Sequence, residues 1–125
     1  MNTGPGVAWL KVAVLYFVVG VGLGIYMAAS HDQVLVPVHA HINLLGWVPL
    51  TLIGLIYRQF PEIADNRLAT IQFWLHNAAL PVAMLALTGI LRGNAALEPV
   101  AGASASVLGA SVLLFAVNLW TPSRK

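Results

Sequence analysis

The stretch V-H-A-H-I-N-L-L-G-W, residues 38–47, places two histidines and an asparagine inside a long apolar run. No Asp, Glu, Lys or Arg occurs from Val34 to Tyr57. Ionisable side chains are costly in an apolar segment of membrane-spanning length, so they usually face a bundle interior or a functional site. Imidazole is the commonest side-chain ligand for metals. We therefore interpret this stretch as a candidate cofactor site that the rest of the chain holds at a fixed depth in a bilayer.

The composition is that of a membrane protein. Of the 125 residues, 59% are hydrophobic and only 8% are charged, and the mean hydropathy is +0.84. An ordinary soluble domain is about 25% charged. Because a membrane-spanning helix takes ~20 apolar residues, the chain has room for four spans and not for five.

The hydropathy pattern predicts a single domain, residues 1–125, folded as an all-α integral membrane four-helix bundle. A cleaved signal peptide is the alternative for the first apolar segment, but that segment exceeds the usual apolar run of ~7–15 residues. We expect membrane spans at residues 7–30, 34–57, 68–91 and 100–120.

Small residues recur on two of the expected spans. Gly20 and Gly24 form a G-x-x-x-G pair in the first, and Gly102, Ser106 and Ala110 repeat at four-residue spacing in the fourth. Such faces allow another helix to approach closely. We therefore expect the chain to form a homo-oligomer. We expect the lipid bilayer to surround it.

The basic residues indicate the orientation, because they are enriched on the cytoplasmic side of membrane proteins. With both termini in the cytoplasm of a bacterium, five basic residues lie on or near the inner side of its cytoplasmic membrane and one, Arg92, lies outside. These charges are scattered, so no nucleic-acid partner is expected. The five inner residues are Lys11, Arg58, Arg67, Arg124 and Lys125.

The chain contains no cysteine, which limits its metal chemistry. Disulfides, thiolate metal sites, covalently attached haem and iron–sulfur clusters are all excluded. Metal binding must therefore use the four histidines, His31, His39, His41 and His76.

His39 and His41 are expected to point to different faces of one helix, because successive residues turn by about 100°. His39 lies four residues before Asn43 and could be a buried histidine bonded to it. The face of His41 is apolar and suits a flat apolar cofactor, although a bond to a neighbouring helix is the alternative. The residues expected on that face are Val34, Val38, Leu45, Val48 and Leu52.

The other two histidines are less informative. Small residues flank His76, which leaves room either for a cofactor or for a close helix, and the pattern does not separate these readings. His31 falls in a link and reads as a surface residue. The expected depths of His41 and His76 differ by roughly 12 Å at ~1.5 Å per residue, which argues against both residues clasping one iron within one chain.

Several of these residues resemble a known family. H-I-N-L-L-G-W at residues 41–47, followed by Gly54, Tyr57, Pro61-Glu62 and Q-F-W-L at residues 72–75, is similar to the start of the catalytic subunit I of haem–copper oxidases. The likeness covers about residues 12–91. It is closest to the nitric oxide reductase and C-type oxidase branches.

The resemblance implies a haem b site. In that family an H-x-N motif on the second helix supplies an axial ligand to the low-spin haem, which corresponds here to His41 with Asn43 as its companion. The family's subunit is much longer, and its second haem ligand and copper-binding histidines lie on later helices that have no counterpart here. His76 does not stand at a family ligand position. The implied site is thus a haem b site without an oxygen-reducing copper centre.

We therefore expect a membrane protein that binds haem b and serves electron transfer or the binding of a diatomic gas, NO or O₂. The metal ligands would be His41 with a second ligand from His76, His39 or a neighbouring subunit. Arg92 is a candidate partner of the haem propionates, and Trp47 is a candidate packing residue on the macrocycle. The expected redox partner is an electron-donor protein or a quinol.

Two alternatives stay open. One is a copper or haem handling or assembly protein without turnover, and the other is a packing subunit without a metal. The sequence shows no Ser/His/Asp set, no paired carboxylates and no phosphate loop, so catalysis away from a metal is not expected. If the chain is an enzyme, it would be an oxidoreductase of the haem–copper oxidase or nitric oxide reductase type.

Overall fold

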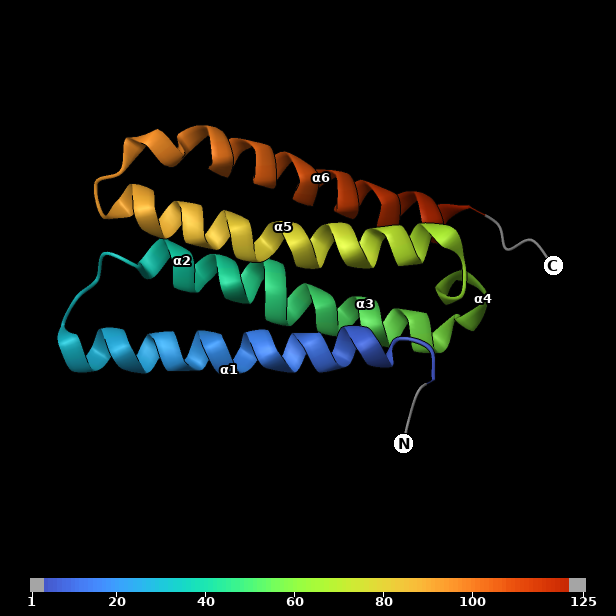
Figure 1. Cartoon of the computed structure of the whole chain (residues 1–125). Coiled ribbons are helices and arrows are strands. Elements are labelled where there is room, and N and C mark those ends of the chain that lie inside the picture. Colours follow the sequence, from blue (N-terminus) through green and yellow to red (C-terminus); the bar gives the residue numbers. More distant parts are fainter. Residues whose placement is uncertain (1–3, 122–125) are drawn as a thin grey trace.

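The computed structural model describes residues 4–121 as long helices that run alternately up and down (Figure 1). Within these residues, four helical segments are long and apolar enough to cross a membrane. The chain is thus a multi-pass membrane protein, and the predicted all-α four-helix architecture is confirmed. The elements are α1 (Val7–Ser30), α2 (Val36–His41), η1 (Ile42–Trp47), α3 (Val48–Gln59), α4 (Pro61–Ala64), α5 (Arg67–Leu91), η2 (Ala95–Leu97) and α6 (Glu98–Trp120).

The second span is continuous from α2 through η1 to α3, and it begins two residues later than expected from the sequence. The Val34 N–H donates to Asp32 Oδ1 at 3.0 Å, and the Val36 N–H donates to the Gln33 carbonyl at 3.2 Å. These bonds form a turn before the helix. Pro37 then falls in the first helical turn, where its missing N–H costs little.

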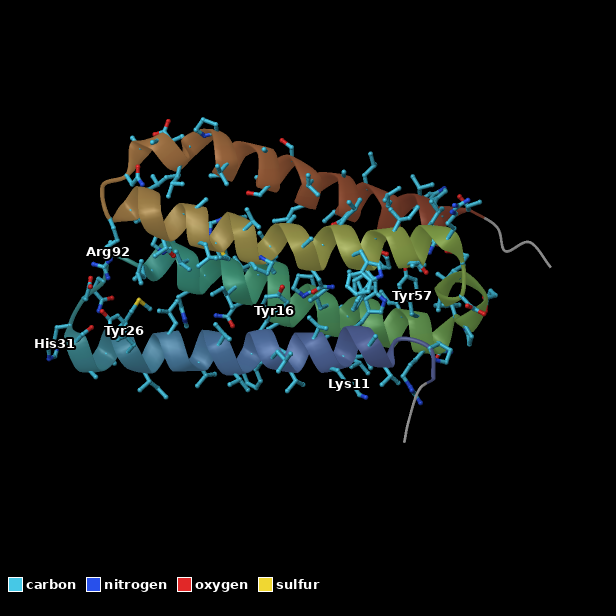
Figure 2. All side chains as sticks on the ribbon, viewed as in Figure 1. Lys11, Tyr16, Tyr26, His31, Tyr57 and Arg92 are labelled. Carbon is cyan, nitrogen blue, oxygen red and sulfur yellow. The ribbon has the colours of Figure 1, made fainter. Side chains whose placement is uncertain are left out.

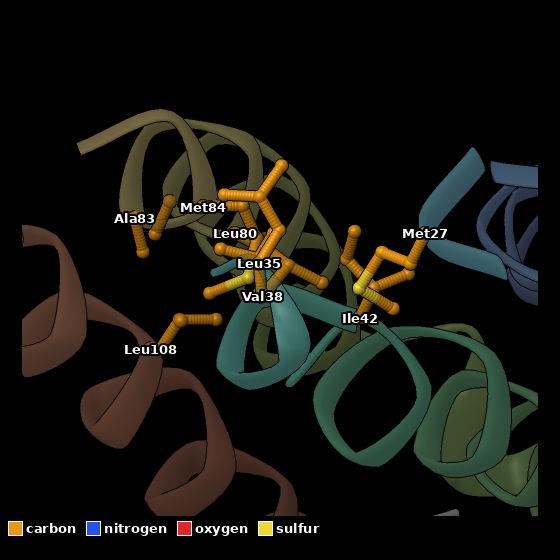
Figure 3. Close-up of a cluster of buried hydrophobic side chains, with 9 residues drawn as sticks. Met27, Leu35, Val38, Ile42, Leu80, Ala83, Met84 and Leu108 are labelled. Atoms are coloured by element: carbon orange, nitrogen blue, oxygen red, sulfur yellow. The ribbon is translucent and has the colours of Figure 1, made fainter. Parts of the chain in front are cut away.

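The helices enclose an apolar core along the bundle axis. Figure 3 shows one cluster of this core, in which side chains from the first, second, third and fourth spans meet. A second cluster lies around the buried Tyr57, toward the end where α1 begins. Many large aliphatic side chains outside these clusters are exposed, as expected for helices whose outer surface faces lipid.

The two ends of the bundle differ in charge. Lys11 lies at the end where α1 begins, and Arg92 and His31 lie at the opposite end (Figure 2). Arg58 and Arg67 flank the connection between the second and third spans. This connection lies at the same end of the bundle as Lys11. The orientation predicted from these residues places this end in the cytoplasm. Arg124 and Lys125 lie outside the described residues.

Candidate functional site

The motif residues that follow His41 form a π-helix, η1, in the middle of the second span. Its wider turn is seen where the Val48 N–H donates to the Asn43 carbonyl, five residues earlier. Pro49 gives a local reason, because a proline has no N–H to offer the Leu45 carbonyl four residues before it. Single π turns inside α-helices occur frequently at functional sites.

His76 supplies a donor to the carbonyl that Pro49 leaves without its usual partner. His76 Nε2 lies 2.6 Å from the Leu45 oxygen, so Nε2 carries the proton and donates it. His76 Nδ1 lies 3.2 Å from Ser111 Oγ, and the side chain is 1% exposed. Because Nε2 carries the proton, Nδ1 accepts from the Ser111 hydroxyl, which also lies 2.8 Å from the Leu108 carbonyl. Both ring nitrogens thus have neighbours inside the bundle, and His76 joins α5 to η1 and α6.

His41 lies in the opposite environment. Its side chain is exposed, and Nδ1 donates to the Pro37 carbonyl, four residues earlier on α2, at 2.6 Å. This bond assigns the proton to Nδ1 and leaves the lone pair on Nε2. Among the described residues, nothing bonds to Nε2.

The surroundings of His41 are apolar. Between Val36 and Leu55, His41 is the one exposed residue that is not apolar. We call the exposed side chains from His41 to Leu55 the exposed stripe. It partly matches the face predicted from a regular helix, because Val48 and Leu52 are exposed, whereas Val38 is buried in the core. The exposed stripe consists of His41, Leu44, Val48, Leu52 and Leu55.

His39 faces α1, as its separation from His41 on a regular helix predicts. A Cβ added at Gly24 would lie 3.1 Å from His39 Cε1, so the ring rests directly on this glycine. The buried Nδ1 of His39 has no hydrogen-bond partner among residues 4–121. Asn43 bonds to His39, but through the backbone: Asn43 Nδ2 donates to the His39 carbonyl at 2.9 Å.

The remaining predicted site residues have partners within the chain. Trp47 stacks on Phe17, with ring centroids 4.1 Å apart and an interplanar angle of 15°. Arg92 donates to Asp32 Oδ2 at 2.8 Å. The Val34 N–H and the Arg92 guanidinium hold the pKa of Asp32 below its usual value, and Asp32 in turn raises the pKa of Arg92.

Two apolar grooves lie on the bundle surface. One of about 410 Å³ lies between α1, the second span and α5, and one of about 510 Å³ lies between α5 and α6. Neither groove is lined by a histidine. In the described part of the chain, no three His, Asp or Glu side chains are grouped as ligands of one ion.

A buried polar cluster was missed by the sequence analysis. Tyr57 donates to Gln72 Oε1 at 2.5 Å, and Asn118 Nδ2 donates to Tyr57 Oη at 3.1 Å and to the Ile63 carbonyl at 2.9 Å. Asn66 Nδ2 donates to Asn118 Oδ1 at 2.7 Å. The available signal was the presence of Gln72 and Asn118 within apolar spans. This cluster connects α3, α4, α5 and α6.

Comparison of the chain with models of protein families, with curated proteins and with solved structures found no match.

Proposed function

We propose that the chain is a haem b protein of the bacterial cytoplasmic membrane, related to subunit I of haem–copper oxidases, with His41 as an axial ligand. Its role would be electron transfer or the binding of a diatomic gas, NO or O₂. The observation that carries the proposal is the bond from His41 Nδ1 to the Pro37 carbonyl, which leaves the Nε2 lone pair on an exposed apolar stripe.

This hydrogen bond is the kind that metal-binding histidines make. A ligating imidazole usually donates its other N–H to a carbonyl or a carboxylate, which fixes the tautomer and the ring orientation and raises the basicity of the ligand. The 2.6 Å separation from the Pro37 oxygen supports this role for His41. The bound iron would supply the redox or gas-binding chemistry, and the residues of the exposed stripe would exclude water from it.

His76 is left out of the proposed site. Its two ring nitrogens are engaged with Leu45 and Ser111, and the side chain is buried. Releasing Nε2 for iron would leave the Leu45 carbonyl without the donor that His76 provides, which is unfavourable inside an apolar bundle. We assign His76 the role of a structural bond between three spans.

Arg92 remains a candidate partner of the propionates on the basis of charge alone. It is paired with Asp32, so a propionate would have to share or replace this carboxylate. Trp47 already stacks on Phe17, which leaves at most its other face for the macrocycle. Copper or haem handling remains the alternative function. In that function His39 and His41 would be two separate binding steps of a transfer route, because they face different sides of α2.

The test is the absorption spectrum of the full chain purified in detergent after expression with haem supplied. We expect a Soret band in the wild type and a loss of bound haem of at least about tenfold in His41→Ala, because removing even a group that only hydrogen-bonds to a metal ligand lowers metal affinity by about 10–100-fold. His31→Ala is the matched control, because His31 is an exposed histidine in a link, and it should keep the band.

Circular dichroism of each variant separates loss of the cofactor from loss of the helices. Bound copper without a haem band would favour the handling function. A colourless wild type without metal would contradict both functions and leave a packing subunit.

A further inference from the structure

The proposed haem site is incomplete in one chain, and the following inference rests on that proposed site. Haem iron accepts axial ligands on both faces of the macrocycle. Both ring nitrogens of His76 have partners in the core, and the His39 ring rests on Gly24 at the α1 interface. Neither side chain can reach the exposed stripe from these positions.

His31 does not complete the site either. It caps the end of α1 in the link before the second span. His41 lies five residues inside the second span from Val36, which is about 7–8 Å of helix beyond the start of α2. The two imidazoles therefore lie at different depths. The Met27 and Met84 side chains, whose sulfur atoms could serve as ligands, are buried in the core.

Within the exposed stripe, the Nε2 atom of His41 requires a partner. A lone pair on an imidazole nitrogen has no donor in hydrocarbon, and an unsatisfied polar group there is strongly unfavourable. His41 is the one polar group between Val36 and Leu55 that the bundle leaves exposed. The site therefore needs an occupant that supplies a bond to Nε2 and is itself apolar enough to lie beside Leu44 and Val48.

We propose that this occupant is a single haem b shared with a second copy of the chain, which contributes its own His41 as the other axial ligand. Copies of one membrane protein insert with the same orientation, so His41 lies at the same depth in each. A twofold axis along the membrane normal keeps these depths equal and brings identical faces together. The two imidazoles would then approach the iron from opposite faces of the macrocycle.

The symmetric site predicts a composition that can be counted. The purified full chain should hold one haem per two chains and should have the mass of two chains, because each copy supplies one of the two axial ligands. Haem is measured by extraction and absorbance, chains by amino-acid analysis, and mass by light scattering with the detergent subtracted. Reduction should give two sharp visible bands, and carbon monoxide should leave them unchanged, because both axial positions of a shared haem would be filled. Such a site would serve electron transfer and not the binding of a diatomic gas.

A mixed pair tests the same point by a second route. Wild-type chain is co-expressed with a tagged His41→Ala chain, and the pairs are purified through the tag. These pairs should lose the spectrum of two histidine ligands and respond to carbon monoxide. Pairs made with tagged His31→Ala serve as the control and should keep the wild-type spectrum.

One haem per chain, a monomeric mass, or unchanged bands in the mixed His41→Ala pairs would each overturn the shared site while leaving haem binding at His41 intact. Absence of any haem in the wild type would instead contradict the proposed function itself. The two failures are therefore distinguishable.

Discussion

Two histidines in similar apolar sequence have opposite environments, and the difference traces to single backbone groups. His76 lies in the core, where it donates to the Leu45 carbonyl, because Pro49 has no N–H to donate to that oxygen. His41 bonds to a carbonyl of its own helix and stays exposed. The division of His39 and His41 between two faces could be predicted, because α2 is regular. The position of His76 could not, because it depends on contacts with two other spans.

At the end of the bundle that holds Arg92, acidification should weaken the ion pair with Asp32. The pKa of Asp32 is held below its usual value in the folded chain. The stabilisation is therefore complete above the unfolded pKa of about 4, and it is lost as the pH falls through the lower folded value. Asp32→Asn removes the charge but keeps an oxygen that can accept the Val34 N–H.

We expect Asp32→Asn to lower the unfolding temperature at pH 6, and this difference from the wild type should diminish in acid as wild-type Asp32 becomes protonated too. Circular dichroism in detergent measures both temperatures. Asp65→Asn is the matched control, since Asp65 is exposed and forms no ion pair among the described residues. A difference that persists unchanged in acid would show that the charge of Asp32 is not what stabilises this link.

At the scale of the elements, the packing of α1 on the second span depends on two glycines. A Cβ at Gly20 would lie 3.0 Å from Asn43 Oδ1, and one at Gly24 would lie 3.1 Å from His39 Cε1. The G-x-x-x-G pair predicted a close approach of another helix, and the helix that approaches belongs to the same chain. The polar residues of the motif thus pack where α1 has no side chains.

Gly24→Leu should therefore destabilise the bundle by about 1–3 kcal/mol, the usual range when a larger side chain is forced into a packed contact. Gly22→Leu is the matched control, because a Cβ there meets nothing within 4 Å. Unfolding in mixed micelles, followed by circular dichroism, gives both free energies. Equal effects of the two substitutions would contradict the close contact between His39 and Gly24.

Regular helical periodicity predicted the faces of the second span only in part. Faces assigned at 100° per residue separate His39 from His41 along α2, and η1 adds a wider turn between Ile42 and Trp47. Val38 precedes η1 and lies in the core, although it was placed on the face of His41, so the wider turn does not explain its burial. Val48 and Leu52 lie beyond η1 and are exposed as predicted. Pro49, which leaves the Leu45 carbonyl without an N–H donor, is visible in the sequence. His76, which donates to that carbonyl instead, comes from the third span and could not be assigned this role from the sequence.

At the scale of the whole molecule, the four spans were predictable because each carries its own hydropathy signal. Their lateral arrangement was not, because it is decided by polar contacts between distant segments. The bond of Asn66 to Asn118, 52 residues apart, is one such contact. The candidate site was likewise predictable only in part. The motif singled out His41 as a candidate ligand, whereas its hydrogen bond to Pro37 and its exposure are seen only in the structure.

The most direct test of haem ligation by His41 is chemical rescue of His41→Gly with imidazole. The substitution removes the ligand and leaves space at its position, so added imidazole should restore the Soret band and the two visible bands of the reduced wild type. 1-Methylimidazole should act similarly, because it retains one nitrogen lone pair. An unaltered Soret band in His41→Gly before any imidazole is added would contradict ligation by His41.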